Sequence, residues 1–328
     1  MRTAVITDTN SGISTKEAAE MGIRSIPMPV LIEGETYYEG VDLESDTFYA
    51  SLTEGKAVTT SQPSPGVVCS AWEAALDEGF DSVVYLPMSS GLSHSCESAQ
   101  LLAANYAGRV AVVDNGRVSV TLRAAVEDAL AMANQGIPAA HIKSELERRA
   151  KLSSIYLAVD DLQFLVRGGR VTPAAAALAS VLKVRPVLSI RTGKIEPFSK
   201  ERGMKKAVAK MFSAAKHDAK KEFDLKADDL VVGVATAGVA PERELEYLEQ
   251  AKAEFPDATV VFNRLPFSVA VHTGPGAMGV GIHARPKQLT AQDSLATEQA
   301  NEQDSKQAGK QTARSKQNEQ TVSSEQGA

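Results

Sequence analysis

The fold of this protein is most clearly indicated by the stretch SVVYLPMSSGLS at residues 82–93. Its first part, residues 82–88, predicts a strand buried on both faces, because apolar and β-branched residues follow one another without alternation. Its second part is a polar turn that leads into helical spacing over residues 93–106. A buried strand, a polar loop and a helix form the repeating unit of a parallel sheet covered by helices.

Strands and helices alternate along the rest of the first 160 residues. Apolar runs predict further strands at 4–7, 23–32, 110–113 and 155–159, and helical spacing predicts helices at 15–21, 65–79, 118–134 and 138–152. We therefore expect residues 1–160 to form an α/β domain whose sheet is mostly parallel and flanked by helices.

The pattern changes after residue 160. Thr172 and Pro173 open an alanine-rich helix over 172–182, as N-cap and first helical residue. A hairpin around Thr192-Gly193, a long amphipathic helix at 204–223, and a strand–helix–strand unit at 231–235, 241–255 and 259–263 follow. We expect residues 161–286 to form a second α/β domain with a mixed sheet and helices.

The chain of 328 residues suggests about two domains, and the last stretch does not belong to either. Residues 287–328 contain no aromatic residue and are rich in Gln, Glu, Ser, Lys and Ala. Such a composition buries too little apolar surface to offset chain entropy, so we expect a disordered low-complexity tail.

Charge and cysteine content exclude several classes of protein. A net charge of −6 does not suit a nucleic-acid binder, and no apolar run reaches the length of a membrane span. The start reaches an acid at Asp8 and has no signal-peptide core, so a cytoplasmic location is expected. Cys69 and Cys96 lack metal-ligand spacing, and no phosphate-binding glycine motif is present, so no metal or cofactor is predicted.

Polar residues follow two predicted strands of the first domain. Residues 8–11, Asp-Thr-Asn-Ser, follow the first strand, and residues 89–93 follow the strand at 82–88; residues 59–64 add further hydroxyls. Because ligands bind beyond the carboxyl ends of parallel strands, these groups suit a carboxylate or phosphate oxygen. The alternative is that they are only helix caps and turn residues.

Two further features have a functional and a structural interpretation. His272 stands just before Gly274-Pro275-Gly276 and either stabilises an anion, orients a hydroxyl, or is a structural histidine. The arginines of Arg167-Gly168-Gly169-Arg170 and Arg202 suit phosphate or an acidic partner, or are solvated surface charges.

An enzyme is the alternative from another functional class. Ser93, His272 and Asp8 contain the residue types of a hydrolase triad, which would make the protein a serine esterase or acyl transferase. The local string Gly91-Leu92-Ser93-His94-Ser95 lacks the second glycine of the nucleophile elbow, which argues against this alternative.

Taken together, the segments resemble the DegV family of bacterial fatty-acid-binding proteins, the carrier subunits of fatty acid kinase. The resemblance covers the chain to about residue 285 in seven ordered segments: VITDTNSGIS (5–14), TTSQPSPG (59–66), SSGLSHSCESA (89–99), VAVVDN (110–115), LQFLVRGGRV (162–171), VLKVRPVLSI (181–190) and VHTGPGAMGVG (271–281). The family's usual string SSGLSGT with a following aromatic is altered here to His94, Ser95 and Cys96.

The resemblance implies two α/β domains with a long-chain fatty acid in a tunnel between them. The carboxylate would be held by Thr60, Ser93 and His272, with Ser61 in support. It also implies a carrier that is not catalytic by itself and presents the acid to a separate ATP-dependent kinase subunit. Arg170 and Arg202 match positions for kinase docking or acyl-phosphate contact, and ligand exchange allows for transient membrane contact.

Overall fold

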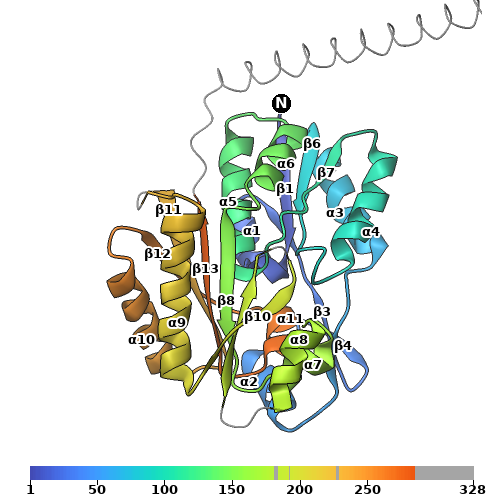
Figure 1. Ribbon diagram of the computed structural model, residues 1–328. Helices are drawn as coiled ribbons and strands as arrows, with labels where there is room; N and C mark the ends of the chain where they lie inside the picture. Colours follow the sequence, from blue (N-terminus) through green and yellow to red (C-terminus); the bar gives the residue numbers. More distant parts are fainter. Residues whose placement is uncertain (181–183, 192, 227–228, 285–328) are drawn as a thin grey trace, which may run out of the picture. The chain divides into compact units, whose positions relative to one another are not determined.

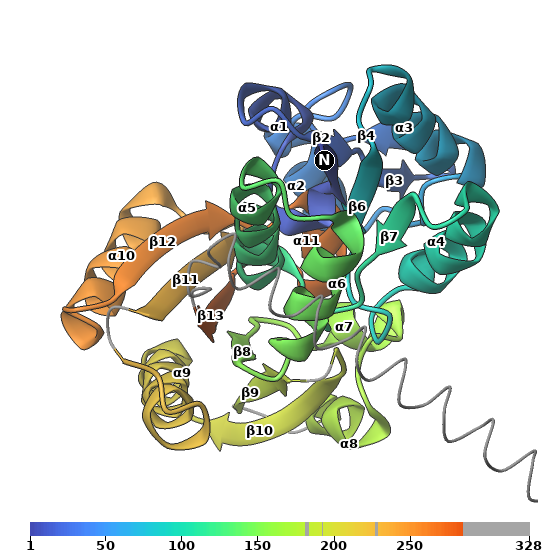
Figure 2. The ribbon, with the colours of Figure 1, turned by 90° about the horizontal axis from the view of Figure 1, so that it is seen from above.

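The first half of the chain forms the predicted parallel sheet, in the order β2-β1-β6-β7 (Figure 1). All three pairings in this sheet are parallel, and Val5 of β1 lies opposite Val84 of β6. Helices α3 and α4 cover one face, and α5 and α6 cover the other (Figure 2). The bounds are β1 Thr3–Asp8, β2 Arg24–Ile26, β6 Ser82–Leu86, β7 Val110–Val112, α1 Thr15–Glu20, α3 Pro65–Asp77, α4 Ser95–Ala103, α5 Ser119–Asn134 and α6 Ala139–Arg148.

A second, mixed sheet has the strand order β10-β9-β8-β13-β11-β12. Its pairings are antiparallel except for β11 with β12, and β9 with β10 is the predicted hairpin. Helices α9 and α10 pack on one face around Phe212 and Phe255. The bounds are β8 Ser153–Ala158, β9 Arg185–Ile190, β10 Ile195–Glu201, α9 Met204–His217, β11 Leu230–Ala237, α10 Pro241–Glu254, β12 Thr259–Arg264 and β13 Ala277–Ala284.

Helix α5 packs against both sheets, between β1 and β6 on one side and β11 and β13 on the other. Two glycines of the mixed sheet make this contact close. A Cβ on Gly233 would lie 2.5 Å from Cβ of Val120, and one on Gly281 would lie 2.7 Å from Cγ2 of Thr121. The start of α5 is therefore held between the sheets, where the two halves of the chain meet.

A small antiparallel sheet, β4-β3-β5, was not predicted. The single strand expected at 23–32 is broken into β2, which stays in the parallel sheet, and β3, which leaves it. The break lies at Met28, whose N–H donates to Thr9 Oγ1 at 3.0 Å instead of to a neighbouring strand. The bounds are β3 Pro29–Ile32, β4 Glu35–Tyr38, α2 Ser45–Thr53 and β5 Val58–Thr60.

The structure describes residues 1–180, 184–191, 193–226 and 229–284, and Met1–Arg285 is one compact unit. The division at residue 160 stays a prediction, although β8 already belongs to the mixed sheet. The alanine-rich helix begins as α8 Pro173–Ala176 and continues as a 3₁₀ turn to Ser180, and the predicted tail lies outside the described residues. In the described part, no helix is long and apolar enough to cross a membrane.

Candidate functional site

A cavity of about 110 Å³ lies between the carboxyl edge of the parallel sheet and the mixed sheet. A buried water needs only about 10–15 Å³ of such space, so the cavity has room for a larger ligand. Most of its wall is apolar, including Val120, Ile155, Leu157, Ile190 and Leu265. Of the six predicted site residues, five line this cavity: Thr60, Ser61, Ser93, Arg170 and His272.

His272 lies in the last turn of α11, Phe267–Thr273, a helix that the sequence analysis did not predict. Phe267 stacks on Phe48 of α2 with ring centroids 4.2 Å apart, and its N–H donates to Glu39 Oε2 at 2.8 Å. The helix ends at Gly274, whose φ of 72° is unfavourable for other residues. The Gly-Pro-Gly turn therefore terminates the helix that carries the histidine.

The side chains of Thr60 and His272 contact each other in the cavity wall, although 212 positions separate the two residues in the chain. Thr60 Oγ1 lies 2.9 Å from His272 Nε2, and His272 Nδ1 is buried without a hydrogen-bond partner among the described residues. Burial, and then the charge of Arg170, lower the pKa of His272 to about 4, so the imidazole is neutral at physiological pH.

The hydrogen bonds assign the tautomer of this imidazole. A buried N–H without a partner is costly, so the proton belongs on Nε2, from which it is donated to Thr60 Oγ1. The hydroxyl proton of Thr60 is then free for a ligand oxygen. The pair supplies one uncharged donor, oriented by α11.

Ser93 comes from the loop between β6 and α4. Its Oγ accepts from Ser95 N at 3.2 Å and donates to Ser95 Oγ at 3.1 Å, so Ser93 bonds the first residue of α4 and also lines the cavity. Both sequence-based interpretations of this serine are therefore compatible. The loop is fixed by the hairpin, because a Cβ on Gly91 would lie 2.4 Å from the carbonyl oxygen of Gly193.

Arg170 stands where the cavity meets a second hollow of about 520 Å³. Its Nη1 donates to the Gly168 carbonyl at 2.5 Å, and Nε donates to the Leu92 carbonyl at 3.4 Å. Lys194 and His94 also line this hollow. The cavity thus adjoins an open hollow lined by two basic side chains, Arg170 and Lys194.

Arg202, the sixth predicted residue, lies elsewhere. It follows the last residue of β10, whereas Ile195 at the other end of that strand lines the cavity. At about 3.3 Å per residue, the strand carries Arg202 roughly 20 Å away from Ile195. Arg202 is exposed and lines neither of the two adjoining hollows.

Asp8 connects the carboxyl ends of two neighbouring strands. Its carboxylate accepts from Asn10 N at 3.0 Å and from Met88 N at 3.3 Å, which joins the ends of β1 and β6. Burial raises the pKa of Asp8 to about 6, and these hydrogen bonds and the nearby Asn10 amide oppose the shift. The amide nitrogen of Asn10 makes no hydrogen bond of normal length and angle.

Ser268 lines the cavity and was not assigned to the site from the sequence, and Asn10, from the predicted polar stretch 8–11, lines it as well. Ser268 Oγ donates to Asn10 Oδ1 at 2.8 Å. Ser268 precedes His272 by four residues, a spacing that would have placed both on one helix face if α11 had been recognised. The four-residue spacing of Ser268 and His272 was visible in the sequence, but a helix of 7 residues is too short to be recognised from its spacing.

The described contacts do not form a nucleophile–base pair. Among hydrogen bonds of the described residues, Ser93 Oγ pairs with Ser95 and His272 Nε2 pairs with Thr60. A serine nucleophile needs the base within hydrogen-bond reach, so the geometry does not favour the esterase alternative. Within the described ranges, no group of three or more His, Cys, Asp or Glu side chains could hold a metal ion.

The two sheets and the mostly apolar cavity define an α/β protein with a cavity suited to a ligand. Residues 2–285 match the family model described as "Uncharacterised protein, DegV family", and the chain belongs to the DegV family. A DegV domain-containing protein of Deinococcus radiodurans is 32% identical over 283 residues, covering 86% of this chain and 98% of the relative.

Two solved structures show the same fold. "Fatty Acid Binding of a DegV family Protein from Thermus thermophilus" has 29% identity and a TM-score of 0.78, covering 87% of this chain and 100% of that one. "Crystal Structure of DegV, a fatty acid binding protein from Bacillus subtilis" has 28% identity and a TM-score of 0.76 with the same coverage, 87% and 100%.

Proposed function

We propose that this protein binds a long-chain fatty acid in the cavity, with its carboxylate at Thr60, Ser93 and His272 and with Ser61 in support. The observation that carries this proposal is the Thr60–His272 pair, 2.9 Å apart, at one polar place in a mostly apolar cavity. The relatives from Thermus thermophilus and Bacillus subtilis, described as fatty acid binding, support the same ligand class.

Uncharged donors suit this ligand for an electrostatic reason. A lysine inside the cavity would be buried unpaired whenever the ligand was absent, at a cost of several kcal/mol. Hydroxyls, one of them oriented by a neutral imidazole, avoid that cost and still donate to the carboxylate. Arg170 supplies positive charge from the exposed side of the site.

We further propose that the protein is a carrier without catalysis of its own, which presents its ligand to a separate ATP-dependent fatty acid kinase. The hollow that contains Arg170 and Lys194 adjoins the carboxylate site and suits the phosphates of an acyl phosphate or of ATP. Arg202 then belongs to the docking surface for the kinase, and ligand exchange involves transient membrane contact.

Ligand binding is tested by organic extraction of the purified protein and mass spectrometry, followed by titration of the stripped protein with oleate. A copurifying acyl chain and micromolar or tighter binding are expected. Ser93→Ala and His272→Ala should weaken binding by about 10-fold to 100-fold, since hydrogen bonds to charged groups are worth about 1.5–3 kcal/mol.

Ser98→Ala, which removes a hydroxyl one turn further along α4, is the matched control and should bind as the unchanged protein does. Circular dichroism of each variant separates loss of ligand from loss of fold. A folded protein that carries no acyl chain and binds no added fatty acid contradicts the proposal. Unchanged affinity in both site variants would show that Ser93 and His272 do not hold the carboxylate.

Presentation to the kinase is tested by supplying ATP and a fatty acid kinase catalytic subunit and trapping acyl phosphate as the hydroxamate. Arg202→Glu should slow formation of acyl phosphate without changing fatty acid affinity, whereas Arg109→Glu, on the residue before β7, should not. Equal rates for the two variants would remove Arg202 from the docking surface, and no acyl phosphate at all would contradict the carrier role.

A further inference from the structure

The start of α5 forms a second polar place in the cavity wall. Val118, Ser119 and Val120 all line the cavity, and Val118 is the N-cap residue of the helix. Valine has no side-chain acceptor, so the N-cap provides no partner for the first N–H groups of this 16-residue helix. These N–H groups carry partial positive charge and suit an oxygen acceptor.

Ser119 gives an independent indication of a ligand. Ser119 is only 5% exposed, and its Oγ has no hydrogen-bond partner in the part of the chain that the structure describes. Its φ of 53° is unfavourable for a residue other than glycine. The chain thus keeps a buried hydroxyl, in a strained conformation, on the cavity wall without a hydrogen-bond partner among the described residues.

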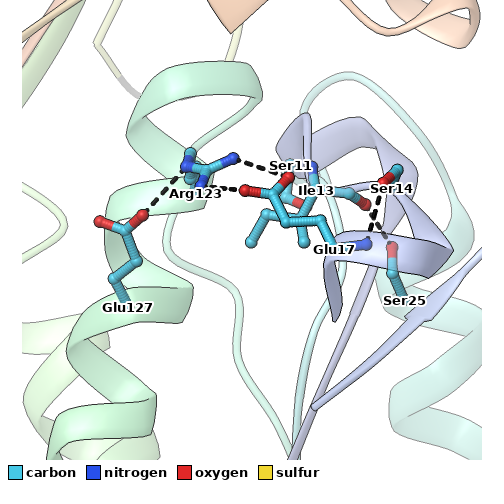
Figure 3. A network of polar contacts seen from close by, with 7 residues as sticks. All are labelled: Ser11, Ile13, Ser14, Glu17, Ser25, Arg123 and Glu127. Atoms are coloured by element: carbon cyan, nitrogen blue, oxygen red, sulfur yellow. Dashed lines mark hydrogen bonds and ion pairs between the residues drawn. The ribbon is translucent and has the colours of Figure 1, made fainter. Parts of the chain in front are cut away.

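The position of this helix start is fixed by the rest of α5 (Figure 3). Arg123 donates to both carboxylate oxygens of Glu17 in α1, and its Nε donates to Glu127 at 2.9 Å. On the other side, the close approach of Gly233 to Val120 leaves no room for the helix to shift toward the mixed sheet. Ser119 therefore cannot find a partner by a small movement of α5.

This polar place comes from α5, whereas Thr60 and His272 come from β5 and α11, and among the described residues no hydrogen bond joins the Ser119 hydroxyl to either of them. Asn10, in the 3₁₀ turn Thr9–Ser11 that packs against α5, bonds Ser268 near the beginning of α11. His272 is four residues further along that helix, and a rise of 1.5 Å per residue makes this a step of about 6 Å. The cavity wall therefore presents two polar places, whereas an unsubstituted fatty acid has one polar end.

We propose that the preferred ligand is a fatty acid that carries an oxygen substituent on its chain, a hydroxyl group in particular, which bonds Ser119 and the N–H groups at the start of α5. The inference rests on the proposed fatty acid binding and adds the substrate class. An acyl chain without a substituent would place methylene groups against Ser119 and the N–H groups of α5. These groups would then lose their hydrogen bonds to water and gain none, which is unfavourable. A hydroxyl both accepts from the N–H groups and donates to Ser119 Oγ.

The test compares stripped protein in titrations with octadecanoic acid and with octadecanoic acids that carry one hydroxyl, either near the carboxyl end, in the middle or near the methyl end. At least one hydroxylated acid should bind about threefold to tenfold more tightly than the plain acid, as expected for one added hydrogen bond. Ser119→Gly should reduce this preference, because it removes one of the two proposed partners of the ligand hydroxyl and leaves the N–H groups in place. Glycine accepts the φ of 53° without strain, so this variant should fold.

The outcomes separate this inference from the proposed function. If plain and hydroxylated acids bind equally to the unchanged protein, the inference is overturned while fatty acid binding stands. If Ser119→Gly lowers the affinity for the plain acid as much as the affinity for the hydroxylated acid, the start of α5 belongs to the carboxylate site and the inference is also overturned. If no acid binds, the proposed function fails and the inference fails with it.

Discussion

At the scale of single residues, the site depends on a histidine that stays neutral. The neighbouring cation Arg170 and burial both disfavour the imidazolium form of His272. A neutral ring holds its proton on Nε2 and orients the Thr60 hydroxyl, while a protonated ring would need a second acceptor at Nδ1 that the described residues do not supply. The chemistry of the site follows from this one protonation state.

This neutrality predicts a pH dependence of the free energy of unfolding. The pKa of His272 is lowered from 6.5 to about 4, so between these values the unfolded chain binds a proton that the folded protein does not. The contribution of His272 to the free energy of unfolding is complete above pH 6.5. It is lost as the pH falls toward 4, and the loss amounts to up to about 3 kcal/mol.

Urea unfolding of ligand-free protein and of His272→Gln, at pH about 7 and about 5, measures the effect. The unchanged protein should lose more stability between the two pH values than the glutamine variant does. The difference between the two pH dependences is the relevant quantity, because Asp8, whose pKa is raised, contributes with the opposite sign in both proteins. Parallel pH dependences would contradict the buried, neutral histidine.

At the scale of elements, α7 (Gln163–Gly168) and α11 must approach closely for the imidazole to reach Thr60. Gly168 ends α7 against the ring, and a Cβ at this position would lie 2.3 Å from His272 Nδ1. Real Cβ contacts are never that short, so any side chain here displaces either the ring or the helix. The glycine therefore keeps the space that the histidine occupies.

We predict that Gly168→Ala weakens fatty acid binding by about tenfold, because the displaced ring no longer orients Thr60. The matched control is Gly66→Ala, since a Cβ at Gly66 in α3 meets no atom within 4 Å. Fluorescence titration with a fatty acid gives both affinities, and thermal unfolding reports on the fold. Equal affinities for the two alanine variants would show that the ring tolerates a side chain at residue 168.

At the scale of the whole molecule, the unit Met1–Arg285 contains both sheets and every residue of the proposed site. Its last strand, β13, is an interior strand that pairs with β8 on one side and β11 on the other. The Ala284 carbonyl accepts from Arg149 at 3.0 Å, so the end of this unit is tied to the segment that follows α6.

We therefore predict that a chain ending at Arg285 folds and binds fatty acid with the affinity of the full chain. A chain ending at Pro275 lacks β13 and should be insoluble or unfolded, because the mixed sheet would lose an interior strand. Circular dichroism and the same fatty acid titration check both chains. A clear loss of affinity on removal of residues 286–328 alone would give that segment a role in binding.

The sequence by itself determined the parallel sheet, the helices on its faces, the hairpin and five residues of the cavity wall. The sheet, the helices and the hairpin depend on local signals, such as the continuous apolar run at 82–88 and helical spacing, whereas the five cavity residues follow from the resemblance to family motifs, among them those around Thr60, Ser93 and His272. Physical signals of this kind act between residues a few positions apart, so they can be read along the chain.

Only the tertiary structure decided which polar groups meet. The split of 23–32 into two strands depends on Thr9, the neutrality of His272 depends on Arg170, and the position of Ser119 depends on glycines in β11 and β13. Arg202, which a motif had grouped with the site, lies at the far end of β10. Burial and close approach are properties of distant segments packed together, and no local pattern contains them.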